Sequence, residues 1–246
     1  MESILRMDRR ELLALKAEDV TWLLTDYELV YITKMLGAFW RYNYNAASKG
    51  RVGKHALLKS GLHSDGFFVS RILLEPENIR NIILRQIVAR LDDANIFTID
   101  YVVGVPYGAT ELGYNIAEII GARKADMEKV DNRIVLTTEI PNGMTLLLVE
   151  DFCTRGTGFK EAVLEVKSKN PSIKILPYNL VILNRGGLKK VVVEGVGRFS
   201  ILPVVEQRVK DWDPKDNCPL CDNGSVAIEP KVDEESWRLL TTSQLK

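Results

Sequence analysis

The chain has 246 residues, of which 46% are hydrophobic and 27% are charged, an ordinary globular composition with ample material for a core. Its 33 basic and 33 acidic side chains balance, so no net charge draws it toward nucleic acid or an anionic membrane. No apolar run approaches the length of a membrane span, so we expect no transmembrane segment. One large domain, or one domain with small additions, is expected.

The N-terminus and the cysteines indicate the compartment. Residues 1 to 20 predict an amphipathic helix rather than a signal peptide, because acidic residues lie inside it and no apolar core follows. Cys153, Cys218 and Cys221 are too few to form a disulfide framework in a chain of this length. We therefore expect a protein of the reducing cytoplasm.

Helices are predicted first along the chain. Residues 8 to 19 and 26 to 42 carry apolar side chains three and four positions apart. Residues 45 to 75 mix glycine with short apolar pieces, which favours strands and turns. A helix is predicted for residues 76 to 92, with Pro76 in its first turn and an isoleucine-rich stripe on one side.

Strands and helices alternate after residue 98. We predict a buried strand, then a helix closed by Gly121, a polar stretch and a short strand-like segment, then further strands with one more helix between them. In order, these lie at residues 99 to 105, 110 to 121, 122 to 133, 133 to 140, 144 to 149, 157 to 169 (the second helix), 175 to 184 and 198 to 205. Such alternation indicates an α/β protein with a central, mainly parallel sheet flanked by helices. The tail after residue 206 is polar and rich in turns.

The stretch LLLVEDFCTRGTGF, residues 146 to 159, carries the main functional signal. Glu150 and Asp151 follow a predicted strand, and ligands of open α/β sheets bind beyond the carboxyl ends of strands. Residues 154 to 158 then form a turn whose amides and hydroxyls suit a phosphate. Neither a Walker loop nor a GxGxxG fingerprint is present. A ribose 5-phosphate fits this arrangement, with the carboxylates on its hydroxyls; a solvated acidic turn is the alternative.

An apolar strand, two acids, two further residues and Thr-x-Gly-Thr resemble the phosphoribosyl-pyrophosphate (PRPP) motif of type I phosphoribosyltransferases. Glu stands at the first acid and Arg where a small residue is common. The resemblance implies the type I phosphoribosyltransferase fold with a small hood subdomain. It also implies PRPP binding by Glu150, Asp151, Thr154, Arg155, Gly156, Thr157 and Gly158, with the two acids also favouring a cationic ribose centre during catalysis.

Two further stretches resemble orotate phosphoribosyltransferases. LLKSGLHSDGFF, residues 57 to 68, is similar to their hood motif, which implies that Lys59 approaches the substrate and that Phe67 and Phe68 border the base pocket. Aromatic faces suit a flat ring, although a Phe pair in the core is the alternative. VILNRGG, residues 181 to 187, lies where the family carries Asp-Arg, so Arg185 would pair with the orotate carboxylate. A solvated arginine is the alternative.

Two loops complete the resemblance. VVGVPYGATELG is similar to the family's pyrophosphate loop, which implies PRPP contacts from Pro106, Tyr107 and Gly108. The polar stretch 122 to 133 lies where the family has its mobile catalytic loop. This implies that Lys129 is the catalytic lysine, with Arg123 and Lys124 as auxiliary PRPP ligands. The alternatives are a plain strand-to-helix turn and a solvated charged loop.

The segment CPLCDNGSVAIEPK, residues 218 to 231, resembles a C-terminal segment of the same branch. A bare Cys-x-x-Cys is half a zinc site. No second cysteine pair follows, and the two histidines, His55 and His63, are distant in sequence. We therefore expect a turn-stabilising tail and no metal held by the protein itself. A metal shared across a dimer is the alternative.

The resemblance covers about residues 50 to 230 and predicts four parts. These are a helical N-terminal extension (1–45), a hood region (46–75), a phosphoribosyltransferase core (76–206) and a C-terminal tail with the CxxC (207–246). The extension has no counterpart in the family and is expected to be a helical cap or a dimerisation element.

The resemblance implies an orotate phosphoribosyltransferase of pyrimidine biosynthesis. Such an enzyme transfers the phosphoribosyl group of PRPP to orotate, releasing pyrophosphate, with Mg²⁺ carried by PRPP. A cytoplasmic homodimer with small-molecule substrates, and without nucleic acid or membrane partners, is implied as well. Two alternatives stay open: a phosphoribosyltransferase for another base, and a non-catalytic PRPP-binding regulator. The neutral charge of the chain disfavours the regulator, which should carry a basic surface.

Overall fold

The computed structural model describes residues 3–96, 98–230 and 233–245. The first residues of the predicted segment 1–45, the last residue of the predicted segment 207–246 and the last residue of the 218–231 motif lie outside the described residues. The chain forms two compact units, Met1–Ile32 with Ser70–Arg208 (unit 1) and Thr33–Val69 with Val209–Lys246 (unit 2). Unit 2 thus combines most of the predicted hood region with most of the predicted tail.

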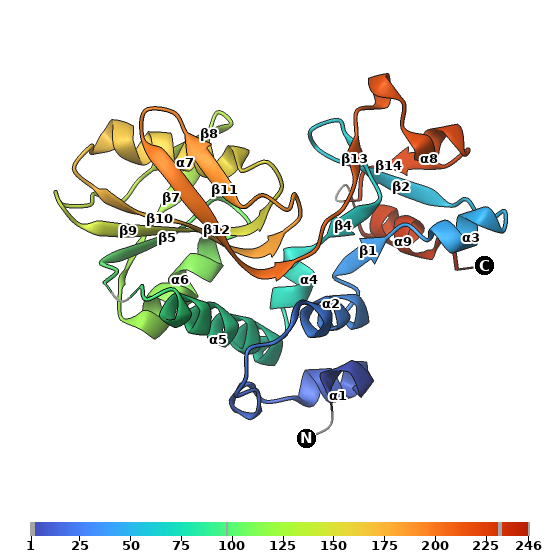
Figure 1. The fold of residues 1–246 in the computed structure, drawn as a ribbon, viewed down its shortest axis with the longest axis horizontal. Coiled ribbons are helices and arrows are strands. Elements are labelled where there is room, and N and C mark those ends of the chain that lie inside the picture. Colours follow the sequence, from blue (N-terminus) through green and yellow to red (C-terminus); the bar gives the residue numbers. More distant parts are fainter. Residues whose placement is uncertain (1–2, 97, 231–232, 246) are drawn as a thin grey trace. The chain divides into compact units, whose positions relative to one another are not determined.

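Unit 1 is built on a six-stranded sheet in the order β11-β12-β10-β9-β5-β6 (Figure 1). All neighbouring strands are parallel except β11, which runs antiparallel to β12. The strands are β5 (Tyr101–Gly104), β6 (Arg123–Ala125), β9 (Thr145–Cys153), β10 (Lys174–Asn184), β11 (Lys190–Val193) and β12 (Gly197–Glu206). The predicted α/β fold with a mainly parallel sheet is confirmed.

Helices cover both faces of this sheet. Helix α7 (Thr157–Lys169) lies on one face, and α5 (Glu77–Asp93) and α6 (Thr110–Ile120) lie on the other (Figure 1). The sheet is buried on both sides, which is why the first half of β9 is a continuous apolar run rather than an alternating one. Helix α6 ends at Gly121, whose φ of 71° gives the left-handed cap that the sequence predicts.

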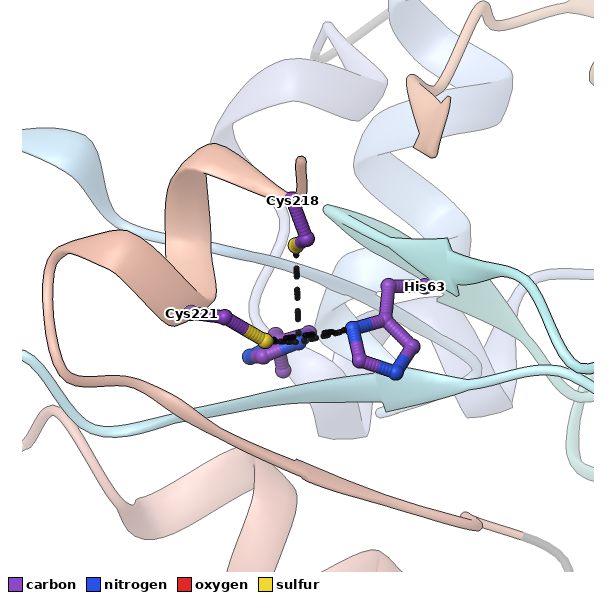
Figure 2. A group of neighbouring side chains, drawn as sticks. His63, Cys218 and Cys221 are labelled. Atoms are coloured by element: carbon purple, nitrogen blue, oxygen red, sulfur yellow. Dashed lines mark hydrogen bonds between the residues drawn. The ribbon is translucent and has the colours of Figure 1, made fainter. Parts of the chain in front are cut away.

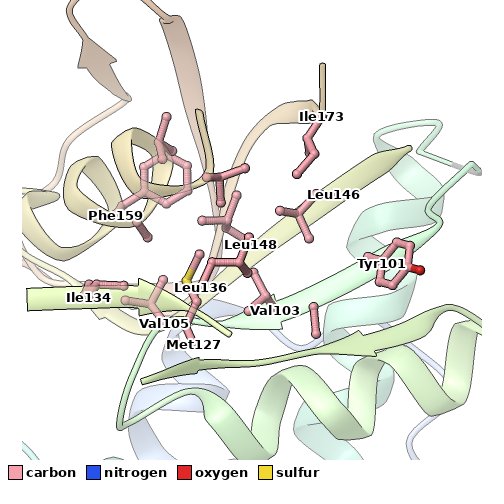
Figure 3. Packing of buried hydrophobic residues seen from close by; sticks show 14 of the residues in the cluster. Tyr101, Val103, Val105, Met127, Ile134, Leu136, Leu146, Leu148, Phe159 and Ile173 are labelled. Carbon is pink, nitrogen blue, oxygen red and sulfur yellow. The ribbon is translucent and has the colours of Figure 1, made fainter. Parts of the chain in front are cut away.

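The core beneath α7 joins strands from across the sheet. Phe159 of α7 packs edge-on against Phe199 of β12 with ring centroids 5.1 Å apart. Figure 3 shows Phe159 beside side chains of β5 and β9, among them Val103 and Leu148. This packing fixes the first turn of α7 against the ends of the central strands.

A hairpin occupies much of the stretch 122–133, which the sequence predicts as a loop. Strands β7 (Met127–Val130) and β8 (Arg133–Leu136) pair across Asp131 and Asn132, whose φ angles of 49° and 62° suit a two-residue turn. The loop prediction was wrong because Met127, with Ile134 and Leu136, forms a buried face that joins the core under α7.

The N-terminal segment packs on α5. Asn78 of α5 donates hydrogen bonds of 2.9 and 3.0 Å to the carbonyls of Leu12 and Leu15, and buried Gln86 bonds the backbone of Trp22 and Leu24. The helices here are shorter than predicted: η1 (Ile4–Arg6), α1 (Arg9–Ala14), η2 (Ala17–Asp19) and α2 (Asp26–Met35). Gly37, with a φ of 75°, follows α2, so residues 39–41 form a strand instead of helix.

Unit 2 contains a four-stranded sheet in the order β13-β3-β2-β14 and a separate β1-β4 pair. Its strands are β1 (Phe39–Arg41), β2 (Lys54–Leu57), β3 (His63–Ser64), β4 (Gly66–Phe68), β13 (Asp211–Trp212) and β14 (Val226–Ile228). Its helices are α3 (Tyr44–Ser48), η3 (Pro214–Asp216), α8 (Pro219–Asp222) and α9 (Glu234–Thr242), while α4 (Ser70–Leu74) belongs to unit 1. The predicted tail therefore supplies strands and helices to a folded unit. None of the described helices is long and apolar enough to cross a membrane.

Candidate active site

The order of the strands in unit 1 indicates where a ligand binds. From β5 the chain passes through α6 to the edge strand β6, and it later returns to place β9 on the other side of β5. The strand order thus reverses between β5 and β9, and open α/β sheets bind ligands at the carboxyl ends of strands at such a point. The predicted pyrophosphate loop follows β5 and the predicted PRPP loop follows β9, so the two meet at this edge.

The two acids lie inside β9 rather than after it. Strand β9 continues to Cys153 because Phe152 and Cys153 pair with Leu183 and Asn184 of β10. The predicted strand, 144 to 149, was therefore too short at its carboxyl end. Glu150 and Asp151 are neighbours near the carboxyl end of this strand.

Glu150 is a buried carboxyl group, only 8% exposed. Asn179 of β10 donates a hydrogen bond of 2.7 Å from Nδ2 to its Oε2. Burial raises the pKa of Glu150 to about 7, the Asn179 bond opposes that rise, and repulsion from Asp151 adds to it. The group can therefore change charge near neutral pH.

Asp151 is held by hydrogen bonds to both carboxylate oxygens. The Ser70 hydroxyl donates to Oδ2 at 2.8 Å, and the Phe152 amide donates to Oδ1 at 2.9 Å. Gly108, in the loop after β5, passes so close that a Cβ there would lie 2.1 Å from Asp151 Oδ2. Only glycine permits this approach, which brings the pyrophosphate loop against the acid pair. The peptide between Pro106 and Tyr107 in this loop is cis.

The predicted PRPP loop turns from β9 into α7. Gly156 precedes the helix with a φ of 68°, and a Cβ there would lie 2.6 Å from Val191. The predicted helix, residues 157 to 169, is confirmed, and its first-turn amides carry the partial positive charge of a helix N-terminus. Thr154, Arg155, Thr157 and Gly158 thus border an amide-rich turn that suits an anion.

Arg185 lies beside this loop and is 4% exposed, so it is not the solvated charge that the sequence left open. Its amide donates a hydrogen bond of 2.8 Å to the Cys153 carbonyl, and its Cζ lies 5.8 Å from the centroid of the Phe152 ring. The neighbouring Asn184 donates from Nδ2 to the Leu188 carbonyl at 2.9 Å, which closes the turn after β10.

The hairpin places Lys129 next to the pyrophosphate loop. The hydroxyl of Tyr107, a residue 70% exposed, donates a hydrogen bond of 3.1 Å to the Lys129 carbonyl. The Lys129 residue is exposed, so its ammonium group has room to move. The predicted catalytic lysine and the predicted pyrophosphate loop therefore adjoin.

Arg123 and Lys124 are not brought to this edge. Arg123 is level with Tyr101, the first residue of β5, and donates to its hydroxyl at 3.0 Å. Lys124 Nζ lies 3.2 Å from Glu118 Oε2. Arg123 and Lys124 therefore lie toward the amino ends of the strands, whereas the acid pair and Gly108 lie at the carboxyl ends.

The predicted base-binding residues of the hood lie in unit 2. Lys59 is exposed in the turn between β2 and β3. Phe67 and Phe68 are 8% and 1% exposed, Phe67 packs 6.0 Å from the Trp237 ring, and Phe68 is paired with Phe39. The two rings thus fill the core of their unit, the packing role that the sequence left open, and their place beside a base stays a prediction.

Two residues of the site were missed from the sequence, Ser70 and Asn179. Asn179 had a visible signal, because it is a polar residue in the middle of the apolar strand ILPYNLVILN. Ser70 had none, since a serine 81 positions before Asp151 is brought to it only by the fold.

The CxxC segment has partners that the sequence analysis discounted. Atoms of His55, His63, Cys218 and Cys221 that can ligate a metal all lie within 4.8 Å of one another (Figure 2). The reasoning that the histidines are too distant was wrong, because β14, which follows the cysteines, pairs with the strand that carries His55.

Comparison with known proteins agrees with this geometry, although no protein-family profile matches the chain. The chain is 29% identical over 182 residues to the orotate phosphoribosyltransferase of Caldanaerobacter subterraneus, covering 72% of this chain and 87% of that protein. It is also 29% identical over 192 residues to the same enzyme of Helicobacter pylori, with 74% and 93% covered. The crystal structure of orotate phosphoribosyltransferase from Aeropyrum pernix superposes with a TM-score of 0.54 at 19% identity, covering 72% of this chain and 93% of that one. The chain is therefore similar in sequence to orotate phosphoribosyltransferases and has the type I phosphoribosyltransferase fold.

Proposed function

We propose that the protein is an orotate phosphoribosyltransferase, which forms orotidine 5-monophosphate and pyrophosphate from orotate and PRPP. The observation that carries the proposal is the meeting of three parts at the carboxyl ends of β5 and β9. These are the acid pair, the amide-rich turn before α7 and the glycine loop against Asp151. The curated relatives that the chain matches over most of its length are named for this activity.

The acid pair binds the ribose in this proposal. Displacement at the anomeric carbon passes through a cationic ribose, and carboxylates at 150 and 151 both accept hydrogen bonds from hydroxyls and favour that charge. Ser70 and Asn179 hold these carboxylates at fixed positions. The protein needs no nucleophile of its own, since it acts by positioning two substrates and by stabilising a departing diphosphate.

The two loops bind the phosphates. Amides and hydroxyls from Thr154 to Gly158 hold the 5-phosphate at the start of α7. Pro106, Tyr107 and Gly108 hold the diphosphate through their backbone. Lys129, beside Tyr107, neutralises the charge that develops as pyrophosphate leaves. Arg123 and Lys124 have no such support, because they pair with Tyr101 and Glu118 at the other end of the strands.

For orotate we propose Arg185, Lys59, Phe67 and Phe68. Arg185 is supported by its burial beside the PRPP loop, where a guanidinium group is weakly solvated and can pair with a carboxylate in two-point fashion. The three hood residues rest on the resemblance of residues 57–68 to the family's hood motif.

Magnesium fits the same edge of the sheet. Mg²⁺ prefers hard oxygen ligands and usually reaches such sites on substrate phosphates, and Glu150 and Asp151 supply carboxylate oxygens beside the loop that would hold the diphosphate. When bound, the ion neutralises negative charge on the diphosphate. The side chains themselves orient the ribose and the phosphates.

We further propose a cytoplasmic homodimer without nucleic-acid or membrane partners. Three cysteines are too few for a disulfide framework in a chain of this length, which suits a reducing compartment, and the balanced charge suits small-molecule substrates. Sedimentation of the full chain at several concentrations measures the oligomeric state.

The proposed activity is tested by pyrophosphate release with PRPP, Mg²⁺ and one base at a time: orotate, uracil, adenine, hypoxanthine or nicotinate. Turnover with orotate alone supports the proposal. Turnover with another base retains the PRPP site but removes the orotate assignment. Calorimetric binding of PRPP without turnover on any base would instead favour the PRPP-binding regulator.

A further inference from the structure

Four potential metal ligands converge in unit 2. His55 and Cys218 are buried, His63 is half-buried and Cys221 is exposed. Figure 2 shows Cys218 and Cys221 on the α8 segment, with the Cys221 sulfur turned toward the His63 ring. Nothing in the proposed phosphoribosyl transfer employs these side chains.

Four of the six distances between the ligand atoms are known and match a tetrahedral site. His55 Nε2 lies 3.0 Å from His63 Nδ1, 3.8 Å from Cys218 Sγ and 3.6 Å from Cys221 Sγ. Cys221 Sγ lies 3.3 Å from His63 Nδ1. In tetrahedral zinc sites, the bond lengths place two nitrogens about 3.4 Å apart, and a nitrogen and a sulfur about 3.6 Å apart. Each of the four distances is within about 0.4 Å of these values.

The fold brings the ligands together through its strand pairing. In the β2-β3 hairpin Leu57 lies opposite His63, so His55, two residues earlier on the same face, is the diagonal neighbour of His63. Strand β14 pairs with β2 and places Ala227 level with His55. The Cys218–Cys221 turn immediately precedes β14, so it is anchored over the histidines.

A hydrogen bond selects the tautomer of His55 that binds metal. Ser225 Oγ donates its hydrogen to the Gly53 carbonyl at 3.1 Å, and with that hydrogen engaged it accepts from His55 Nδ1, 2.9 Å away. His55 then carries its hydrogen on Nδ1 and directs the lone pair of Nε2 at His63 and the two sulfurs. Histidines that bind metals are almost always oriented by such a bond from the other ring nitrogen.

We propose that His55, His63, Cys218 and Cys221 form a structural zinc site. Two thiolates and two imidazoles in tetrahedral arrangement are the ligand set of zinc among the common divalent metals. All four positions are filled by the protein, which is the mark of a structural rather than a catalytic site. The zinc ion ties the β2-β3 hairpin to a segment that lies 163 residues further along the chain.

The first experiment measures metal in the full-length protein purified under reducing conditions without chelators. Elemental mass spectrometry should find about one zinc ion per chain. Protein stripped of metal should take up Co²⁺ and show the visible absorption of a tetrahedral thiolate complex. Zinc added to the stripped protein should raise its melting temperature.

Variants then test the ligand set. Cys221→Ser is the primary variant, because Cys221 is exposed and the protein should still fold. It should lose bound zinc and the thiolate bands of Co²⁺. Cys153→Ser is the matched control, since Cys153 lies in β9 of unit 1, and it should retain both. Ser225→Ala keeps all four ligands and should weaken zinc affinity about 10- to 100-fold in competition with a chromogenic chelator.

Three results would overturn the proposal. The first is purified protein that contains no zinc. In that case the metal-free protein would also fail to compete with the chelator for Zn²⁺, and added Zn²⁺ would not raise its melting temperature. Another is zinc binding that persists unchanged in Cys221→Ser. The third is a Cys218–Cys221 disulfide that persists in the protein purified under reducing conditions. None of these readouts depends on phosphoribosyl transfer.

Discussion

Asn179 of β10 donates a hydrogen bond of 2.7 Å to the carboxyl group of Glu150, which is only 8% exposed. A buried carboxyl group that loses one of its donors keeps its desolvation cost with less compensation, here from the Phe159 backbone alone. Asn179→Ala should therefore lower the free energy of unfolding by about 1–3 kcal/mol and weaken PRPP binding. Denaturant unfolding and calorimetric titration with PRPP and Mg²⁺ measure the two effects.

Asn170→Ala is the matched control, since Asn170 donates from the same kind of amide to the Ile140 carbonyl, away from the acid pair. It should cost some stability and leave PRPP affinity unchanged. If both variants bind PRPP like the wild type, Asn179 has no part in positioning Glu150.

The raised pKa of Glu150 makes stability depend on pH. Its pKa is about 7 in the fold against about 4.5 in the unfolded chain, so the folded state holds more protons between these values. Stability from this group is therefore present below about pH 4.5 and is lost as the pH rises through 7, by on the order of 3 kcal/mol. Glu150→Gln should remove this loss.

The readout is the difference in the free energy of unfolding between wild type and Glu150→Gln at several pH values. A difference that stays constant from pH 5 to pH 8 would refute the raised pKa.

Gly108 should not tolerate a side chain. A Cβ would lie 2.1 Å from Asp151 Oδ2, so Gly108→Ala must push the pyrophosphate loop or the carboxylate away. Such overpacking costs about 1–3 kcal/mol, and the displaced loop should bind PRPP at least about tenfold more weakly. Gly158→Ala, whose Cβ would lie 3.2 Å from Glu150 Oε1, is the graded comparison and should do less harm. Equal affinities in the two variants would contradict the close approach.

Lys129 should act on turnover rather than on binding of the donor. Lys129→Ala should lower kcat by about 10²-fold, because one charge that stabilises the leaving pyrophosphate is lost, while PRPP affinity changes little. Lys190→Ala, another exposed lysine in a strand of unit 1, should leave kcat unchanged. Steady-state kinetics and PRPP titration separate the two parameters, and an unaltered kcat in Lys129→Ala would remove Lys129 from the mechanism.

The sheet and the glycine turn before α7 were predictable because their signals are local. Three signals lie within about two dozen residues of one another: the apolar run before Glu150, the glycines of the turn and the apolar stripe of α7. The apolar residues indicate burial, and the glycines indicate the backbone geometry of the turn. Helix α5 was predicted for the same reason, and it was placed to within a residue at both ends.

The contacts that complete each site depend instead on the fold. Ser70 meets Asp151 and His55 meets Cys218 across 81 and 163 positions, and no local pattern reports such pairs. The hairpin at Lys129 was missed since its polar residues outnumber the few apolar ones that are buried. The role of the last forty residues was missed because short strands at a sheet edge have little periodicity to detect.

The strand order of unit 2 has a consequence for synthesis of the protein. In β13-β3-β2-β14 the middle pair comes from the first part of the chain and both outer strands come from the last part. During synthesis on the ribosome, both outer edges of the β2-β3 hairpin therefore stay unpaired until β13 and β14 have been made. Bare edges invite pairing with other chains. A chain truncated after unit 1 would keep this hairpin with both edges unpaired. We therefore expect such a chain to aggregate rather than merely to lack a tail.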